Sequence, residues 1–449
     1  MMRLSAAAVF ADGRTSGGDP VFSGVSTDTR TLRAGDLFVA LRGDRFDGHA
    51  FLEQAKAGGA VAAMVDTRHQ GTFPLPVAVV DDTRLGLGRL AAGWRSRFAP
   101  LLIAVTGSNG KTTVKEMLAA ILRVHAGADA VLATSGNLNN DIGLPLTLLR
   151  LREQHRCCAI ELGMNHKGEI AYLARIARPG VALVNNAQRE HLEFMSSVEE
   201  VAAENASVYG ALTGDGVAVV NADDPQAGLF RKAAGARRVV DFGLQHGAVS
   251  GGYILKDLSS ELVVRTPGGE APATLAIPGL HNVRNALAAA ACAYAVGVKE
   301  KTIGEGLSAF RPYAGRLQVK QAKSGATVID DTYNANPDSV RAAIDVLASC
   351  TPPTALVLGD MGEVGAKGDE FHREVGSYAA AKKIDRLYAL GEATRHTVQA
   401  FGSGARHFDS VDQLVSAVEG RSILVKGSRF MRMERVIAAL TGNATVGGH

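Results

Sequence analysis

The sequence predicts an α/β protein of three domains, in which short buried strands alternate with helices. Its 449 residues correspond to two to four domains at roughly 100–200 residues per domain. Short apolar runs alternate with segments of helical periodicity, which is typical of sheets covered by helices. One apolar run precedes a glycine-rich turn and an amphipathic helix, and this arrangement marks the start of the central domain.

The first domain is expected over residues 1–98 as an α/β unit. Strand-like runs lie at 36–41, 60–65 and 77–80, and a helical segment lies at 51–57. The central domain is expected over residues 99–310 and opens on the run Leu-Leu-Ile-Ala-Val at 101–105, apolar throughout like a strand buried on both faces. Further buried strands are expected at 158–160, 181–184 and 216–220.

The third domain is expected over residues 311–449, after a boundary near Arg311-Pro312. Strand-like runs at 326–330, 355–358 and 422–425 are separated by helical segments. This pattern predicts a smaller, Rossmann-like open sheet.

Composition excludes several classes of protein. The hydrophobic fraction of 46% supplies several cores and excludes a disordered chain. The 51 glycines follow no G-X-Y period, so a collagen is excluded. A net charge of +3 is too balanced for a general nucleic-acid binder.

Cysteine usage and hydropathy favour the cytoplasm. The four cysteines show neither zinc-like spacing nor a disulfide framework. No apolar run reaches the ~18 residues of a membrane span, and residues 4–11 favour a first helix over a signal segment. We therefore expect a cytoplasmic protein with no integral membrane segment.

The sharpest motif is Thr-Gly-Ser-Asn-Gly-Lys-Thr-Thr at residues 106–113, between a buried strand and a helix. Glycines let backbone N–H groups turn toward an anion, and the helix N-terminus adds partial positive charge. Lys111 can reach outer phosphates, and the Thr112 hydroxyl can complete a Mg²⁺ shell. The loop is one residue shorter than G-x-x-x-x-G-K-[ST]. The alternative, a chance glycine-rich turn, is disfavoured by the flanking strand and helix.

This loop resembles the ATP loop of the Mur ligases, a family of amide-forming enzymes of peptidoglycan precursor synthesis. Further resembling segments lie at 136–145, 160–165, 279–286, 330–337 and 358–363, so the resemblance spans nearly the whole chain. Asn-Leu-Asn-Asn at 137–140 and Tyr-Asn-Ala-Asn-Pro at 333–337 are most similar to the family branch that joins D-alanyl-D-alanine to UDP-N-acetylmuramoyl-tripeptide.

The resemblance implies an ATP-dependent ligase that activates a carboxylate as an acyl phosphate, which an amine then attacks. Positive charge must lie between ATP and the carboxylate, and Mg²⁺ and Lys111 are its expected sources. The resemblance also implies that the first domain binds UDP-sugar, the central domain binds ATP, and the third domain binds the amine substrate. We expect small-molecule substrates, no nucleic acid and a monomer. The alternatives are another ligase of the superfamily, including folylpolyglutamate synthetase, and a nucleotide-gated binding protein without catalysis.

The resemblance assigns site residues one by one. It makes Lys111, Glu161 and His191 catalytic, with Thr112, Glu161 and His191 at Mg²⁺. The implied nucleotide contacts are Gly107, Ser108, Asn109, Gly110, Lys111, Thr112, Thr113, Asn282, Arg316 and Asp331. For Asn282, a pure helix cap is the alternative.

Substrate contacts fall into two implied groups. Those to UDP-sugar are Ser26, Thr27, Asp28, Arg30, Arg42, Gly48 and His49, in the segments 26–30 and 42–49. Those to the peptide or the amine are Asn139, Tyr333, Asn334, Asn336 and Lys426. Short polar turns are the alternative for the first group, and an exposed basic turn is the alternative for Lys426.

One position departs from the family pattern. Many Mur ligases carry a carbamylated lysine fourteen residues after the histidine, and here that position is Asn205. Asparagine has no amine, so carbamylation at this site is excluded. We expect that Asn205 or Glu204 partly substitutes, or that a second Mg²⁺ is held more weakly.

Overall fold

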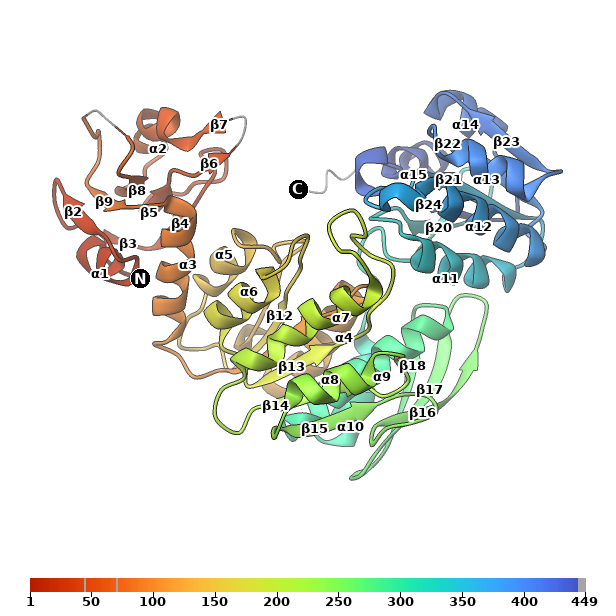
Figure 1. Ribbon diagram of the computed structural model, residues 1–449, viewed down its shortest axis with the longest axis horizontal. Helices are drawn as coiled ribbons and strands as arrows, with labels where there is room; N and C mark the ends of the chain where they lie inside the picture. The colour runs from red at the N-terminus through yellow and green to blue at the C-terminus, as the bar shows by residue number, and fades with distance from the viewer. Residues whose placement is uncertain (44–45, 70–71, 443–449) are drawn as a thin grey trace.

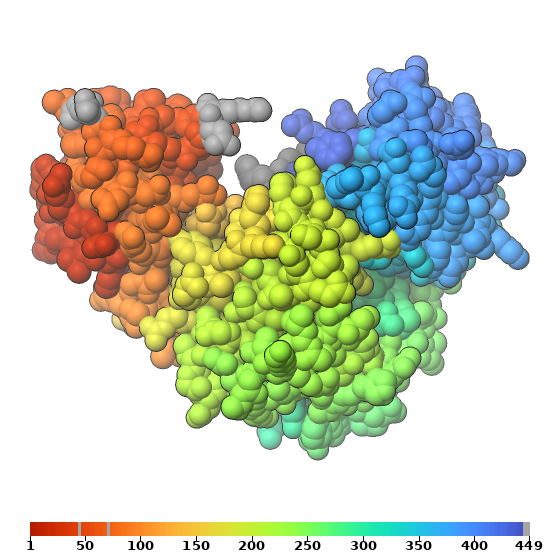
Figure 2. Space-filling model, viewed as in Figure 1, coloured from red at the N-terminus to blue at the C-terminus, as the bar shows by residue number. Residues whose placement is uncertain are grey.

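A computed structural model describes residues 1–43, 46–69 and 72–442 and confirms the α/β class. Three lobes follow one another along the chain (Figure 1). The N-terminal and C-terminal lobes stand on one side of the central lobe, and Figure 2 shows a hollow between them.

The N-terminal lobe is built on a five-stranded sheet. Its order is β2 (Arg14–Ser16), β9 (Val77–Val80), β8 (Ala62–Asp66), β5 (Asp36–Val39) and β4 (Gly24–Ser26). All neighbours are parallel except β2 and β9. Two small pairs join β1 (Met2–Arg3) to β3 (Val21–Phe22), and β6 (Arg42–Gly43) to β7 (Phe46–Asp47). The helices are α1 (Leu4–Phe10), η1 (Gly48–Phe51), α2 (Leu52–Ala57) and α3 (Thr83–Arg95).

The central lobe has a fully parallel six-stranded sheet. Its order is β11 (Val131–Ala133), β12 (Cys157–Glu161), β10 (Leu101–Thr106), β13 (Val181–Val184), β14 (Val217–Asn221) and β15 (Arg238–Phe242). Around it lie α4 (Lys111–Ala126), η2 (Ala128–Ala130), α5 (Gly143–Leu148), α6 (Glu169–Ala177), α7 (Val198–Ala206), η3 (Ser207–Ala211), α8 (Ala227–Ala234), α9 (Leu280–Ala295) and α10 (Glu300–Ala309).

Strand β10 explains why the central apolar runs are continuous. Ile103 and Val105 pack into the core that contains α4 and α9, whereas Leu102 and Ala104 pack into the core that contains α3 and α6. Because helices cover both faces, the side chains from Leu102 to Thr106 are all buried, whereas Leu101 at the start of the strand is exposed. The predicted strands at 101–105 and 181–184 are therefore confirmed.

A second, antiparallel sheet of the central lobe was not predicted. It consists of β16 (Ser250–Leu255), β17 (Ser260–Thr266) and β18 (Gly269–Leu275). Leu262 and Val264 of β17 are buried, whereas Glu261, Val263 and Arg265, which alternate with them, are more exposed, as expected for a sheet with one covered face. The glycines of β16 and a proline within β18 weakened the strand signal in the sequence.

The C-terminal lobe is a second open sheet. Its order is β19 (Gln318–Gln321), β20 (Thr327–Asp331), β24 (Ser422–Lys426), β21 (Thr354–Gly359), β22 (Arg386–Leu390) and β23 (Ala405–Phe408), with only β19 antiparallel to its neighbour. The helices are α11 (Pro337–Ala348), η4 (Gly365–Lys367), α12 (Gly368–Ala381), α13 (Thr394–Phe401), α14 (Val411–Ala417), η5 (Arg429–Met431) and α15 (Glu434–Thr441).

The carboxyl ends of strands from the central and C-terminal sheets meet at the interface of their lobes. Glu161 ends β12, and Asp331 and Lys426 end β20 and β24. One cluster of buried apolar residues extends from the central sheet through α9 to α11 and joins the two lobes. Each predicted domain contains a sheet, and the division at residues 98 and 310 stays a prediction.

Across residues 1–43, 46–69 and 72–442, no helix is both long and apolar enough to cross a membrane.

Candidate active site

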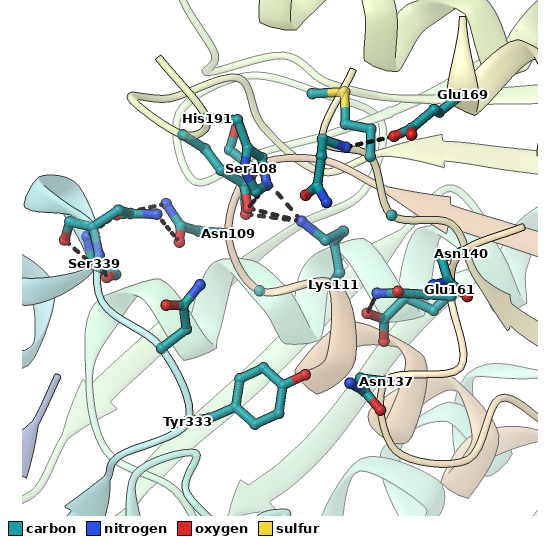
Figure 3. A pocket seen from close by; sticks show the side chains of 18 of the residues that line it. Ser108, Asn109, Lys111, Asn137, Asn140, Glu161, Glu169, His191, Tyr333 and Ser339 are labelled. Carbon is teal, nitrogen blue, oxygen red and sulfur yellow. Dashed lines mark hydrogen bonds and ion pairs between the residues drawn. The ribbon is translucent and has the colours of Figure 1, made fainter. Parts of the chain in front are cut away.

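A polar cavity lies between the central and C-terminal lobes (Figure 3). The central lobe contributes the phosphate-loop residues Ser108 to Lys111, together with Glu161 and His191. The C-terminal lobe contributes residues 333–336, Ser339 and Lys426, and Arg316 from the connecting segment also lines the cavity. The structure therefore brings the predicted catalytic residues together with the predicted peptide contacts.

The predicted phosphate loop joins β10 to α4. Gly107 and Gly110 have φ angles of 132° and 81°, which favour glycine. A Cβ atom at Gly107 would also lie 3.0 Å from the backbone nitrogen of Asn186. Because α4 begins directly at Lys111, its first N–H groups and its dipole lie at the loop, as an anion site requires.

Lys111 folds back over this loop. Its Nζ atom donates to the carbonyl oxygens of Gly107 at 2.6 Å and Ser108 at 3.1 Å, and it lies 3.1 Å from Oε1 of Glu190. The ammonium thus stands among oxygen acceptors at the mouth of the loop, where a phosphate oxygen can replace one of them. Thr112 and Thr113 follow within the first turn of α4 and are both buried.

Glu161 is a buried carboxylate with one unsatisfied oxygen. Its Oε1 accepts a hydrogen bond from Nδ2 of Asn139 at 2.8 Å, and its backbone N–H donates to the Thr134 hydroxyl at 3.0 Å. Its Oε2 is buried without a hydrogen-bond partner. A buried carboxylate oxygen without a partner is costly, and a cation is the ligand that would offset this cost.

His191 lies in the loop after β13, on the other side of Lys111 from Glu161 (Figure 3). Its Nδ1 atom is 2.7 Å from Oε2 of Glu363 in the C-terminal lobe, and its Nε2 atom is 3.5 Å from Glu190. His191 and Glu363 both have left-handed backbones, with φ angles of 53° and 58°. Such backbones are uncommon for these residue types, and here they place the two side chains face to face. Contact with His191 lowers the pKa of Glu363.

The residues present fit a magnesium ion for which phosphate and water supply most of the ligands. Among the described residues, no three His, Cys, Asp or Glu side chains converge on one point. The unsatisfied Oε2 of Glu161 nevertheless offers one hard oxygen ligand beside the loop that carries Thr112. Mg²⁺ is commonly bound through one or two carboxylates and substrate phosphates, so such a sparse site suffices.

A second cavity continues from the first along the other side of the phosphate loop. Its lining includes Asn109, Gly110, Thr113, Asn282, Arg316 and Asp331, all predicted nucleotide contacts. Asn282 does not cap α9, because Gly279 is the N-cap residue and the Asn282 amide donates to the Pro278 carbonyl at 2.7 Å. His281 also lines this cavity, and burial lowers its pKa to about 4, so that its ring is neutral.

Two predicted contacts, Asp331 and Lys426, form a buried ion pair with each other. Lys426 Nζ lies 2.6 Å from Asp331 Oδ2 and donates to the Asn334 carbonyl at 2.9 Å. Burial raises the pKa of Asp331 and lowers that of Lys426, and each charge partly offsets the effect on the other. Lys426 thus lines both cavities while it is engaged in this ion pair, and its role toward an amine substrate stays a prediction.

Arg316 and Tyr333 stack between the two cavities. The Arg316 guanidinium lies 3.9 Å from the centre of the Tyr333 ring, in a cation–π contact. The Nε atom of Arg316 is buried without a hydrogen-bond partner. An unsatisfied cationic donor that lines the nucleotide cavity suits a phosphate oxygen. Tyr333 and Asn334 face the first cavity, where they are predicted to contact peptide.

Polar contacts between the lobes hold the cavity walls together. Asn336 caps α11 and donates through Nδ2 to Oδ1 of Asn109, in the phosphate loop, at 2.9 Å. Arg189, two residues before His191, contacts Asp338 at 2.6 Å and Glu374 at 2.7 Å across the interface. The loop that carries His191 is therefore attached to the C-terminal lobe on both sides of Glu190.

The predicted UDP-sugar contacts follow neighbouring parallel strands of the N-terminal sheet. Ser26 ends β4, with Thr27, Asp28 and Arg30 after it, and Arg42, Gly48 and His49 follow β5. Asp44 and Arg45, within the same predicted segment, lie outside the described residues. The topology thus brings both segments to one sheet edge, the usual ligand edge of such a sheet.

Several of these side chains also support the fold. His49 is buried, and its Nε2 atom accepts the Asp66 backbone N–H at 3.0 Å. Burial disfavours ionisation of Asp66, but hydrogen bonds from Arg42 and Arg68 outweigh it and hold the pKa at about 2. Arg30 forms an ion pair with Asp28 at 2.6 Å.

Asn205 and Glu204 both accept hydrogen bonds within the central lobe. Asn205 is fully buried, and its Oδ1 accepts a hydrogen bond from the Thr106 hydroxyl at 2.6 Å. Glu204 accepts the backbone N–H groups of Gly168 and Ile170, both at 2.9 Å, at the start of α6. Both side chains are therefore engaged in the fold, and their part in holding a second Mg²⁺ stays a prediction.

Sequence reasoning missed four residues of the site: Arg189, Glu190, Glu363 and Asn185. Arg189 and Glu190 directly precede the predicted His191, and this proximity in sequence is the one signal that could have found them. Asn185 donates to the Asn109 carbonyl at 2.8 Å and supports the phosphate loop from β13. Glu363 is distant in sequence, and its contact depends on how the lobes dock.

Three domains of one protein family match three successive segments of the chain. Residues 21–95 match the Mur ligase family catalytic domain, residues 105–293 the Mur ligase middle domain, and residues 315–429 the Mur ligase glutamate ligase domain. The chain belongs to the Mur ligase family. Its three matched segments coincide with the three lobes, and the matches together cover more than half of the chain.

Individual Mur ligases resemble the whole chain. It is 40% identical over 445 residues to the UDP-N-acetylmuramoyl-tripeptide–D-alanyl-D-alanine ligase of Escherichia coli, covering 97% of each chain. It is 35% identical to the Bacillus subtilis enzyme of that name, covering 94% of this chain and 93% of the relative.

Solved structures of Mur ligases share the fold. The crystal structure of MurF from Acinetobacter baumannii aligns with a TM-score of 0.91 and 35% identity, covering 98% of each chain. MurF from Thermotoga maritima in complex with ADP aligns with a TM-score of 0.82 and 26% identity, covering 94% of this chain and 98% of the other.

Proposed function

We propose that this Mur ligase uses ATP to join D-alanyl-D-alanine to UDP-N-acetylmuramoyl-tripeptide. The likeness to relatives of that name along 97% of the chain carries the proposal. The cavity between the lobes supports it, because the predicted phosphate loop and the predicted peptide contacts line one space.

The chemistry proceeds in two steps. The tripeptide carboxylate oxygen attacks the γ-phosphorus of ATP, the bond to the β-phosphate oxygen breaks, and an acyl phosphate and ADP form. The amine of D-alanyl-D-alanine then attacks the acyl carbon, and the tetrahedral intermediate expels phosphate to leave the amide. Both steps concentrate negative charge, so preorganised positive charge is the main requirement.

Residues of the chain supply that charge from two lobes. The N–H groups at the start of α4 and the Lys111 ammonium face the β- and γ-phosphates, and Arg316 reaches them from the segment that links the lobes. Glu161, Thr112 and His191 would hold Mg²⁺, which neutralises phosphate charge when bound. Closure of the lobes excludes water that would hydrolyse the acyl phosphate.

The remaining assignments complete the proposal. Asn282 and Asp331 bind the nucleoside, and Asn139, Tyr333, Asn334, Asn336 and Lys426 contact the peptide and the amine. The N-terminal edge formed by residues 26–30 and 42–49 binds the UDP-sugar. The boundaries at residues 98 and 310 would separate a UDP-sugar domain, an ATP domain and an amine-substrate domain. We propose a monomer that acts in the cytoplasm, consistent with four free, buried cysteines.

The deciding experiment measures ADP release with ATP, Mg²⁺, UDP-N-acetylmuramoyl-tripeptide and D-alanyl-D-alanine, each omitted in turn. ADP must form only when all are present, together with the amide product in mass spectrometry. ADP release that requires D-glutamate or a free diamino acid as the amine would assign a different ligation step. Tight ATP binding without any ADP release would contradict catalysis altogether.

A further inference from the structure

Lys115 is a fully buried lysine that the proposed chemistry does not use. It lies in α4 four residues after Lys111, and its side chain is 0% exposed. Burying an ammonium group is costly unless partners compensate, and an apolar side chain would fill the same space at lower cost. The contacts of this ammonium therefore indicate what the lysine is for.

Those contacts tie α4 to the end of an edge strand. Lys115 Nζ donates to the carbonyl oxygen of Thr134 at 2.8 Å and forms an ion pair with its neighbour Glu116. Thr134 directly follows β11, and its backbone N–H donates to the Ala159 carbonyl at 3.1 Å. In the described part of the chain β11 is an edge strand with β12 as its neighbour, and contacts from α4 such as this one help to fix its position.

Thr134 in turn holds Glu161 by two routes. Its hydroxyl accepts the backbone N–H of Glu161 at 3.0 Å. It also begins the segment that carries Asn139, whose amide donates to Oε1 of Glu161 at 2.8 Å. The backbone and one carboxylate oxygen of Glu161 are thus fixed, which leaves Oε2 as the unsatisfied atom.

We propose that Lys115 is a positioning residue that, through Thr134, orients the Glu161 carboxylate toward Mg²⁺. The proposal rests on the magnesium role of Glu161 in the proposed function, and it does not depend on the identity of the peptide substrates. Groups that orient a ligating carboxylate act on metal affinity, and their loss typically costs about 10–100-fold.

A binding measurement separates this role from simple stabilisation of the fold. Isothermal titration calorimetry gives the Kd of the non-hydrolysable analogue AMP-PCP in magnesium chloride and in EDTA. The ratio of the two constants reports the contribution of the metal. We expect Lys115→Met to reduce this ratio about tenfold and to leave the Kd in EDTA unchanged.

Two further variants make the result decisive. Thr134→Val removes only the hydroxyl that holds Glu161, and we expect the same loss of the ratio, so this variant decides the outcome if Lys115→Met fails to fold. Arg123→Met removes an exposed cation from the same helix and should keep the wild-type ratio.

Three results would overturn the proposal: an unchanged ratio in folded variants, an equal weakening with and without Mg²⁺, or a wild-type protein whose binding ignores Mg²⁺. Because no peptide substrate enters the assay, failure of the proposed ligation would be detected separately by the ADP-release experiment.

Discussion

Arg189 of the central lobe and Asp338 of the C-terminal lobe form a double contact across the interface. The Arg189 guanidinium donates to Oδ1 of Asp338 at 2.6 Å, and the Arg189 backbone N–H donates to Oδ2 at 3.0 Å. The same guanidinium reaches Glu374 at 2.7 Å and lies over the Phe371 ring. Contacts to Glu374 and Asp338 raise the pKa of Arg189, so it stays charged at any working pH.

We expect Arg189→Met to lower kcat/KM for ATP about 10–100-fold, because hydrogen bonds to charged groups contribute about 1.5–3 kcal/mol each. The variant loses interface contacts and no predicted substrate contact. Initial rates against ATP concentration test this, and small-angle X-ray scattering should show a larger radius of gyration. Arg373→Met, an exposed change on α12 whose partner His396 lies in the same lobe, is the control. Equal kinetics for both variants would show that the contacts of Arg189 with Asp338 and Glu374 are not needed for closure of the lobes.

Lys111→Ala should reduce kcat by about 10²–10³-fold, because it removes a preorganised charge at the phosphates. The Lys111 side chain lines the cavity and is not part of an apolar core. The variant should therefore keep its fold, which circular dichroism can check. Lys167→Ala, which removes an exposed lysine paired with Glu200, should retain wild-type rates. Normal turnover of the Lys111 variant would exclude the assigned phosphate loop.

Asp66 should make the N-terminal lobe sensitive to acid. Its pKa is about 2 in the folded protein against an ordinary value of 3.8. The carboxylate therefore contributes about 2 kcal/mol of stability above pH 4, and this contribution disappears as the pH falls toward 2. Thermal unfolding measured from neutral pH down to about pH 2 should show Asp66→Asn destabilised at neutral pH, with a difference from wild type that shrinks in acid. The control Asp12→Asn changes an exposed carboxylate. A difference that is independent of pH would refute the assignment.

Turnover should not depend on dissolved CO₂. Asn205 cannot be carbamylated, and it is hydrogen-bonded to Thr106 inside the central lobe. Rates in degassed, bicarbonate-free buffer should equal those after bicarbonate is added back. A loss of rate that bicarbonate restores would reveal a carbamylated lysine elsewhere in the site.

The local parts of this site could be predicted from sequence because each depends on neighbours in the chain. A buried strand followed by glycines and a helix determines where Lys111 lies, and the apolar run before Glu161 places that carboxylate at a strand end. Such signals need only periodicity and turn chemistry.

The contacts between lobes could not be predicted in this way. Arg189 and Asp338 are 149 residues apart, and each is an ordinary polar residue in its own segment. The left-handed backbones of His191 and Glu363 leave no mark in the sequence, because non-glycine residues adopt them only where the surrounding structure requires it.

The cavity lies between the edges of two sheets that belong to different lobes. Neither lobe carries a complete set of charges, and the chain from Ala309 to Gln318 is all that joins their helices and strands covalently. That short tether sets the effective concentration of one half-site around the other. Cutting it would turn a unimolecular closure into an encounter between two solutes, and activity would then fall with dilution.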